Sequence, residues 1–359
     1  MIEIENLHLK AGEFEIKVNR LKIRKSEYLT LMGPSGAGKT LFLEAIAGFR
    51  KILKGKIFVE GRDVSKLPPE KRGLAYVPQD YALWPHMTVY ENIAYGIKAR
   101  KVGKNEVKKR VLEVAEIMGI RELLNRMPKT LSGGEMQRVA VARALITEPK
   151  AVLLDEPLSS LDTATKNKVK DFMKELHSKL KFTAIHVTHD PLEATELGDR
   201  IAVMIGGEII QVGKPIEVLR NPKTIEAAWV GGIPNLIEGI VKQSDGEVVN
   251  VSVGDIEIVI AHKKPLMQGL KALLMLRPED IVLSKSLIKT SARNTIKCKV
   301  VEVEDKGPLI HVKIERGKLN LRAVITRGSY EELEIKPGKE IYASFKASAV
   351  RVISTKSLK

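Results

Sequence analysis

The stretch Gly33-Pro34-Ser35-Gly36-Ala37-Gly38-Lys39-Thr40 decides the fold, because its spacing, G-x-x-x-x-G-K-[ST], is that of a phosphate-binding loop. The apolar run 28–32 before it predicts a buried strand, and residues 41–47 after it predict a helix that ends at Gly48. Between a strand and a helix, the N–H groups of such a loop point at one phosphate. We therefore expect all eight residues to bind a nucleotide; a glycine-rich turn that only caps a helix is the alternative.

Lys39 and Thr40 have separate expected roles in this loop. Lys39 is predicted to reach the β- and γ-phosphates of the nucleotide. Thr40 is predicted to offer its hydroxyl to Mg²⁺, a hard ion that keeps several waters and takes few protein ligands.

The composition indicates a protein of two domains. The chain has 359 residues, more than one hydrophobic core usually supports. Its one cysteine, Cys298, excludes an intramolecular disulfide and a multi-cysteine metal site, fits a reducing compartment, and is expected to pack in a strand. No segment approaches the roughly 18 to 20 apolar residues that span a bilayer, and residues 1–5 do not start a signal peptide, so we expect a soluble, cytoplasmic chain.

The charge balance is strongly basic, with 60 Lys and Arg against 44 Asp and Glu, a net charge of +16. Such an excess is compatible with nucleic acid, an anionic membrane face, an oxyanion ligand or simply a charged surface. Charge alone does not choose among these partners.

Three further apolar runs each predict a buried strand that ends beside a polar residue. In an open α/β sheet, ligands bind at the carboxyl ends of the strands. The runs are 74–77 before Gln79, 151–154 before Asp155 and Glu156, and 184–187 before His189. We predict that Asp155 faces Mg²⁺, that Glu156 acts on the nucleophilic water, and that Gln79 contacts Mg²⁺ or that water. An accidental acidic pair and a structural histidine are the alternatives.

Two helical segments follow from periodicity and glycine placement. Residues 104–127 carry apolar side chains at helical spacing, with Gly119 as a stop, and predict an amphipathic insert. The run 131–135, with Ser132, Gly133 and Gly134, predicts the start of a second helix over 136–146. Helix N-termini attract phosphate, so this start is a second candidate anion site.

Aromatic residues allow two interpretations each. The alternation over 14–18 predicts a half-exposed strand in an antiparallel edge, and its Phe14 either stacks on an adenine ring or is an ordinary strand aromatic. A second group either faces a partner or, as we favour, packs in the core: Tyr81, Trp84, Tyr90 and Tyr95.

These motifs occur in one order, with residues 159–162 (Ser-Ser-Leu-Asp) after the acidic pair. The set closely resembles the ATP-binding subunit of ABC transporters over residues 1–230, with its Walker A, Q-loop, signature, Walker B, D-loop and switch histidine. The resemblance implies a P-loop NTPase domain of the α/β class with a helical subdomain at about residues 90–145, and ATP with Mg²⁺ as its cofactors. Glu135 stands where the family's signature has Gln. ATPase activity is still expected, because the serine and the glycine backbone supply the phosphate contacts.

The resemblance also implies a head-to-tail homodimer in which each nucleotide lies between two copies. One copy supplies the loop, and Ser132 and Gly134 come from the other. Gly133 and Asp162 are also expected to bind the nucleotide. Glu156 polarises water, His189 holds the γ-phosphate, and closure passes through residues 79–95 to transmembrane permease subunits.

A second domain is predicted over residues 231–359. Gly231-Gly232-Ile233-Pro234 is an expected joint, after which short alternating strands with Gly and Pro turns predict a small barrel or sandwich. The strands expected are 248–253, 256–260, 297–301 and 310–314. OB-like barrels bind nucleic acid elsewhere, but an aromatic content of 4% supplies few stacking platforms, so no nucleic acid is expected.

Two segments of this domain, 290–294 and 345–350, resemble the molbindin-type fold, while 276–281 resembles the accessory barrel of importer ATPases. The resemblance implies a regulatory site for molybdate or tungstate built from Ser291, Arg293, Asn294, Lys346 and Ser348. Hydroxyls, N–H groups and cations suit a tetrahedral dianion. A structural turn or another ligand is the alternative, and Pro308 departs from the glycine-rich turn expected there.

Together these features predict the ATP-hydrolysing motor of a molybdate/tungstate importer, peripheral to the cytoplasmic face of the membrane and served indirectly by an extracytoplasmic oxyanion-binding protein. A sulfate, sugar or polyamine importer is the first alternative. A soluble ATPase acting on nucleic acid ranks lower, because such relatives usually carry two ATPase units and this sequence has one set of motifs.

Overall fold

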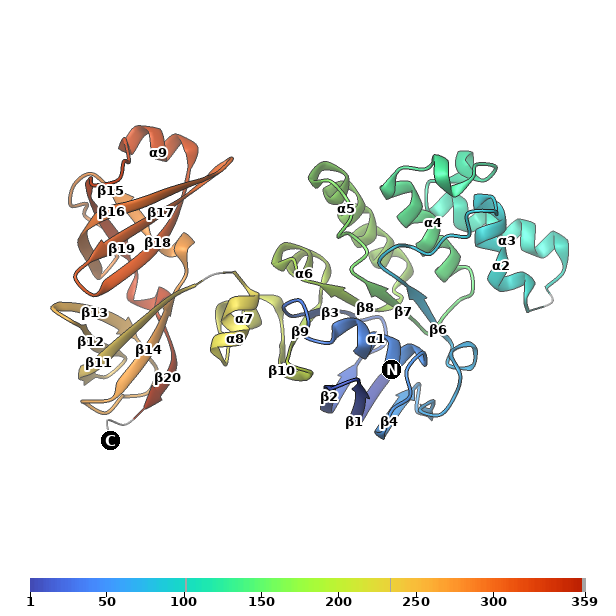
Figure 1. Cartoon of the computed structure of the whole chain (residues 1–359), viewed down its shortest axis with the longest axis horizontal. Helices are drawn as coiled ribbons and strands as arrows, with labels where there is room; N and C mark the ends of the chain where they lie inside the picture. The colour runs from blue at the N-terminus through green and yellow to red at the C-terminus, as the bar shows by residue number, and fades with distance from the viewer. Residues whose placement is uncertain (101, 233, 357–359) are drawn as a thin grey trace. The chain divides into compact units, whose positions relative to one another are not determined.

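The computed structural model describes residues 1–100, 102–232 and 234–356. The chain divides into two compact units, Met1–Arg220 and Asn221–Lys359 (Figure 1). The sequence placed the boundary at 230/231, ten residues later, so helix α8 (Ile225–Val230) belongs to the second unit. Ile233, in the predicted joint, lies outside the described residues.

The first unit is built on a ten-stranded mixed sheet. Strands β6, β7, β8, β3 and β9 run parallel, and a hairpin of β1 and β2 pairs antiparallel with β4, as the sequence predicted for this edge. In spatial order the strands are β5 (Arg62–Asp63), β4 (Lys54–Val59), β1 (Ile2–Ala11), β2 (Phe14–Ile23), β10 (Glu208–Gly213), β9 (Arg200–Ile205), β3 (Tyr28–Met32), β8 (Thr183–Thr188), β7 (Ala151–Asp155) and β6 (Leu74–Val77).

The central strands are apolar because both faces of the sheet are covered. Every residue of β3, β7 and β8 is buried, the pattern expected of parallel strands between two layers. One apolar cluster contains Leu31 and Phe42 of α1, and another contains Leu154 and Val139 of α4. This burial fixes the strand ends, where the polar motifs follow.

Helices cover this sheet and form the helical region predicted near residues 90–145. The insert predicted over 104–127 is α-helical only to Ile117, because Gly119 adopts φ +59° and ends the α-helix as expected. No helix of the described residues is both long enough and apolar enough to pass through a bilayer. The α-helices are α1 (Lys39–Ala47), α2 (Val89–Lys98), α3 (Lys104–Ile117), α4 (Gly133–Leu145), α5 (Thr163–Leu180), α6 (Pro191–Leu197) and α7 (Pro215–Arg220), with 3-10 turns η1 (Pro69–Lys71), η2 (Arg121–Leu123) and η3 (Pro128–Thr130).

The second unit consists of two antiparallel five-stranded sheets that share one apolar core, which confirms the predicted β-rich domain. Cys298 is buried in that core, as expected. One sheet has the order β13 (Ile256–Ala261), β12 (Val248–Val253), β11 (Asn235–Asp245), β14 (Lys271–Leu276) and β20 (Arg351–Lys356). The other has the order β15 (Val282–Ser284), β19 (Glu340–Phe345), β16 (Asn294–Lys306), β17 (Leu309–Arg316) and β18 (Leu319–Thr326). Short helices complete it: α8, α9 (Arg327–Leu333), η4 (Pro278–Asp280) and η5 (Ala347–Ala349).

Candidate nucleotide site

Four neighbouring parallel strands end at one edge of the sheet and bring the predicted residues together. In the order β3, β8, β7 and β6, each strand pairs with the next up to its last residues: Met32 with Thr188, Val187 with Asp155, and Leu154 with Val77. The phosphate loop, His189, the Asp155–Glu156 pair and Gln79 therefore follow adjacent strand ends. Their convergence is a consequence of strand order.

The phosphate loop has the conformation that its glycines allow. Gly36 and Gly38 adopt φ of +80° and +92°, which side chains disfavour, and Gly38 caps the N-terminus of α1. Gly33 is required for a different reason, because a Cβ there would lie 2.1 Å from the Met204 carbonyl oxygen. The outer residues Pro34, Ser35 and Gly36 are exposed, so the loop is open to a ligand.

Lys39 is buried at the centre of this loop. Its Nζ donates to the carbonyl oxygens of Gly33 at 2.9 Å and Pro34 at 3.0 Å, and lies 3.8 Å from Glu156 Oε1. Burial lowers the pKa of Lys39, against the opposing pull of Glu156 and Asp155. The Lys39 ammonium is therefore held against the first two residues of the phosphate loop.

Thr40 and Asp155 form a pair of hard oxygen donors. Thr40 Oγ1 donates to Asp155 Oδ1 at 3.1 Å, and the hydroxyl of Tyr76 donates to Asp155 Oδ2 at 3.0 Å. Burial raises the pKa of Asp155 above its ordinary value, although the hydrogen bonds from Thr40 and Tyr76 act in the opposite direction. A hydroxyl beside a carboxylate, with few further protein ligands, fits Mg²⁺ bound together with phosphate oxygens and water. Sequence reasoning missed Tyr76, whose only signal was its place in the strand before Gln79.

Glu156 lies between Lys39 and the switch histidine. Its Oε2 is 3.4 Å from His189 Nδ1, and its backbone N–H donates to the Val187 carbonyl at 3.1 Å. Glu156 adopts φ +44°, an unusual value for a residue with a side chain, and Ser159 Oγ holds its carbonyl at 2.8 Å. The geometry turns the carboxylate out of the strand direction toward the loop.

Gln79 contacts the D-loop in this structure. Its Nε2 donates to Ser159 Oγ at 3.2 Å. Its predicted metal role is untested by this contact and stays a prediction.

The predicted signature residues form the start of α4. Ser132 caps the helix in a capping box: Glu135 Oε2 accepts from the Ser132 N–H at 2.7 Å and from its Oγ at 2.8 Å. The Ser132 N–H lowers the pKa of Glu135. Glu135, which departs from the family signature, thus completes the capping box at the start of α4, and a carboxylate is a good hydrogen-bond acceptor for that role.

Gly133 and Gly134 let this helix start pack closely on the D-loop and α5. A Cβ on Gly133 would lie 2.7 Å from Leu161, and one on Gly134 would lie 3.0 Å from Thr165. Asp162 caps α5 by accepting from the N–H groups of Ala164 and Thr165 at 3.1 Å each, which lowers its pKa. These contacts explain the residue types, and their nucleotide-binding roles stay predictions.

The aromatic residues divide between the two interpretations. Tyr81 is 3% exposed and donates to the Pro157 carbonyl at 3.1 Å, so it packs in the core. Trp84 and Tyr95 stack with ring centroids 4.3 Å apart, and Tyr95 is 49% exposed. Phe14 packs beneath the phosphate loop, where a Cβ on Gly38 would approach its ring to 2.7 Å. A contact of Phe14 with adenine stays a prediction.

In the second unit, β16 and β19 bring the two predicted oxyanion segments side by side, since Asn294 pairs with Phe345. Asn294 itself is 3% exposed, and its side-chain amide bonds the N–H and carbonyl of Val259 at 2.8 Å each. The other four residues are exposed: Ser291, Arg293, Lys346 and Ser348. Asn294 therefore joins two strands, and the exposed four are the part that can meet a ligand.

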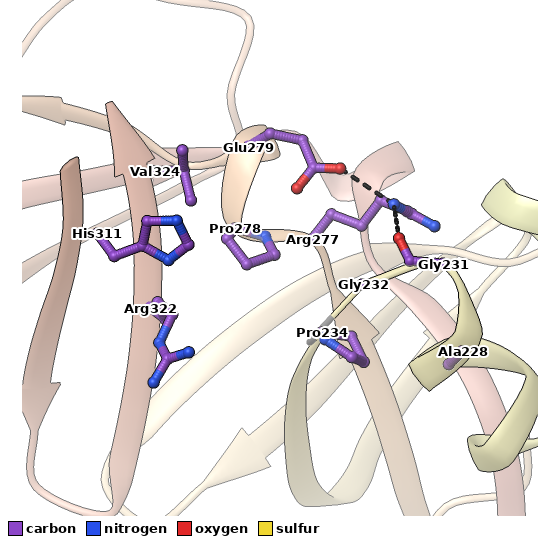
Figure 2. Close-up of a pocket in the computed structure, with 10 residues that line it drawn as sticks. All are labelled: Ala228, Gly231, Gly232, Pro234, Arg277, Pro278, Glu279, His311, Arg322 and Val324. Atoms are coloured by element: carbon purple, nitrogen blue, oxygen red, sulfur yellow. Dashed lines mark hydrogen bonds and ion pairs between the residues drawn. The ribbon is translucent and has the colours of Figure 1, made fainter. Parts of the chain in front are cut away.

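A cavity of about 190 Å³ lies elsewhere in the second unit (Figure 2). None of the five predicted oxyanion residues lines it. Its cations have acidic neighbours: Arg277 pairs with Glu279 at 3.1 Å, and Arg322 lies 3.6 Å from Glu304. The cavity therefore has no clear preference for an anion.

The loop, the acidic pair and the histidine at one sheet edge define an ATPase of the P-loop class. A family profile described as ABC transporter matches residues 16–159, and one described as TOBE domain matches residues 290–352. The chain belongs to the ABC transporter family of ATP-binding proteins, as the full-length relatives described next also show.

The molybdate/tungstate import ATP-binding protein WtpC of Pyrococcus abyssi is 45% identical over 98% of this chain and 100% of that protein. The spermidine/putrescine import ATP-binding protein PotA of Thermotoga maritima is 39% identical over 84% of this chain and 83% of that protein. Among solved structures, a dimeric ATP-binding cassette in a post-hydrolysis state with ADP and Pi is 31% identical, with a TM-score of 0.53, and covers 60% of this chain and 99% of its own.

Proposed function

We propose that this chain is the ATP-hydrolysing subunit of an importer for molybdate and tungstate. The observation that carries the proposal is the similarity to WtpC of Pyrococcus abyssi, which extends through both units. The relative named for polyamine import is less similar over a smaller part of the chain, so a polyamine importer is the weaker alternative.

Hydrolysis follows from the positions of the side chains at the sheet edge. The loop N–H groups and Lys39 bind the phosphates and stabilise charge that develops on them. Glu156, 3.4 Å from His189, orients a water and accepts its proton, while His189 donates to the γ-phosphate. Thr40 and Asp155 would hold Mg²⁺, which would neutralise charge on the phosphates.

The proposed active form is a head-to-tail dimer. Ser132, the residue that caps α4, is exposed and Gly133 is partly exposed, so this helix start is accessible to a partner's nucleotide. The similar solved cassette is described as a dimer with ADP and Pi, which supports this arrangement.

In this proposal the dimer lies peripherally on the cytoplasmic face of the membrane, attached to permease subunits through residues 79–95. The half-exposed Tyr95 beside Trp84 gives that region an apolar contact surface. An extracytoplasmic binding protein delivers the oxyanion to the permease. The second unit senses molybdate or tungstate through Ser291, Arg293, Lys346 and Ser348, with Asn294 holding the strands.

The test is calorimetry and ATP turnover with the full chain. We expect molybdate or tungstate to bind and sulfate or spermidine not to bind, and we expect hydrolysis of MgATP. Binding of spermidine without molybdate or tungstate would favour the polyamine importer, and absence of ATP turnover in the chain reconstituted with its membrane subunits would contradict the motor function.

A further inference from the structure

Helices α5 and α6 are joined by a ladder of ion pairs. Lys166 Nζ lies 2.6 Å from Glu193 Oε1 and 2.9 Å from Asp190 Oδ2, and one turn further along α5 Lys170 Nζ lies 2.9 Å from Glu196 Oε2. Figure 1 shows the two helices beside the central strands of the first unit. We call the Lys166 contacts the first rung and the Lys170 contact the second rung.

The first rung is largely withdrawn from water. Glu193 is 3% exposed, and the Lys166 side chain is 21% exposed. Burial alone would raise the pKa of the Glu193 carboxyl, but His186, Lys166 and Thr188 outweigh it and lower the pKa to about 2. Removing one partner of such a group leaves a buried charge without compensation, which is far costlier than losing a surface pair.

This rung lies where two functional loops end. Lys166 is in the first turn of α5, which is capped by Asp162, the last residue of the D-loop. Asp190, which directly follows His189, caps α6. The rung therefore ties the end of the D-loop to the end of the switch-histidine segment.

Both neighbours of His189 in the sequence are held by the rung. On one side, Thr188 Oγ1 donates to Glu193 Oε2 at 2.6 Å. On the other, Asp190 binds Lys166, and its N–H donates to Thr188 Oγ1 at 3.0 Å. The His189 side chain is 59% exposed, so its position depends mainly on this fixed backbone.

We propose that Lys166 and Glu193 are positioning residues for ATP hydrolysis. They hold His189 and the D-loop at the correct positions relative to Glu156. This inference rests on the proposed function, because the reaction it concerns is ATP hydrolysis. The two residues act through the backbone of residues 188–190. Nucleotide binding by the phosphate loop does not depend on them.

The test compares Lys166→Met with Lys166→Arg and with the second-rung variant Lys170→Met in the full chain. Lys166→Met is expected to lower kcat by about tenfold to about a hundredfold, the scale of a small misplacement of reacting groups, while the KM for ATP changes less than about twofold. Lys166→Arg keeps the charge and is expected to restore most of kcat. Lys170→Met is expected to leave kcat nearly unchanged.

A second variant, Glu193→Gln, covers the case in which Lys166→Met does not fold, because glutamine keeps the volume of the glutamate side chain. Glu193→Gln is also expected to lower kcat with little change in the KM for ATP. Unchanged kcat in Lys166→Met, or an equal loss in Lys170→Met, would overturn the inference. So would a rise in KM that matches the fall in kcat. A native chain that hydrolyses no ATP even when reconstituted with its membrane subunits would instead contradict the proposed function itself.

Discussion

The two units hold their candidate sites in different ways. In the first unit, four parallel strands deliver the phosphate loop, Glu156 and His189 to one edge, and buried contacts fix most of their positions. In the second unit, paired strands bring the oxyanion segments together, but four of the five side chains are exposed and Asn294 is used inside the fold. Contacts within a single chain therefore fix the phosphate-loop half of the proposed nucleotide site, whereas the predicted oxyanion residues lie mostly on the surface of their unit.

The largest effect is expected at the sheet edge, with Glu156→Gln. Loss of the group that accepts the water's proton should lower ATP turnover by about 10²-fold or more, while ATP binding persists because Lys39 and the loop are intact. Steady-state ATPase assays and nucleotide-binding titrations measure the two effects. Glu175→Gln, on the exposed face of α5, is the matched control. Normal hydrolysis by Glu156→Gln would contradict the assigned role.

The buried Glu193 predicts a pH-dependent stability in the first unit. Its pKa is lowered from 4.5 to about 2, so its stabilising contribution is present above about pH 4.5 and is lost as the pH falls toward 2. Glu193→Gln should therefore lose on the order of 3 kcal/mol of unfolding free energy at pH 7, and less as the pH drops through this window. Denaturant unfolding at pH 7 and pH 3 measures the difference, and an equal loss at both pH values would refute it.

In the second unit, exposed and buried residues of the same predicted site should behave differently. Arg293→Ala should weaken molybdate or tungstate binding by about tenfold to about a hundredfold, the value of a charged hydrogen bond, without lowering stability. Asn294→Ala should instead destabilise the unit by about 2 kcal/mol, because it leaves the Val259 N–H and carbonyl unpaired. Calorimetry and melting curves separate the two, with the exposed Arg316→Ala as control. Equal behaviour of both variants would remove the distinction between the two kinds of site residue.

The smallest effect is expected at Glu135. Glu135→Gln keeps an acceptor for the Ser132 N–H, so stability should change by less than about 0.5 kcal/mol and ATP turnover by less than about twofold. Ser132→Ala removes the cap and should cost about 1 kcal/mol. Thermal melts of both variants make the comparison. A large loss of turnover in Glu135→Gln alone would show that the departure from the family signature has a chemical role.

Local patterns predicted the strand ends that bring the candidate nucleotide-site residues together. The apolar runs before Lys39, Asp155 and His189 identify buried strands directly, since parallel strands between two layers are apolar throughout. Strand order then brings those ends together. Periodicity also found the amphipathic insert, although it extended the helix past Ile117, where Gly119 reverses the backbone.

The sequence could not show contacts between distant polar residues. Tyr76 reaches Asp155 across neighbouring strands, and Lys166 meets Glu193 between two helices; neither pair has a spacing that links its members. Asn294 was predicted as a ligand from its motif, while its amide is taken up by Val259 on another strand. Side-chain partners of this kind depend on tertiary packing and need the structure.

The most direct test of the account is whether Ser132 of one copy reaches the phosphate loop of another. With Cys298→Ser as background, Ser35→Cys and Ser132→Cys would be combined in the full chain that also carries Glu156→Gln, and disulfide formation between copies would be followed by gel electrophoresis. We predict a crosslinked dimer that forms with MgATP and not without nucleotide. Absence of the crosslink while ATP is demonstrably bound would contradict the claim that two copies enclose the nucleotide.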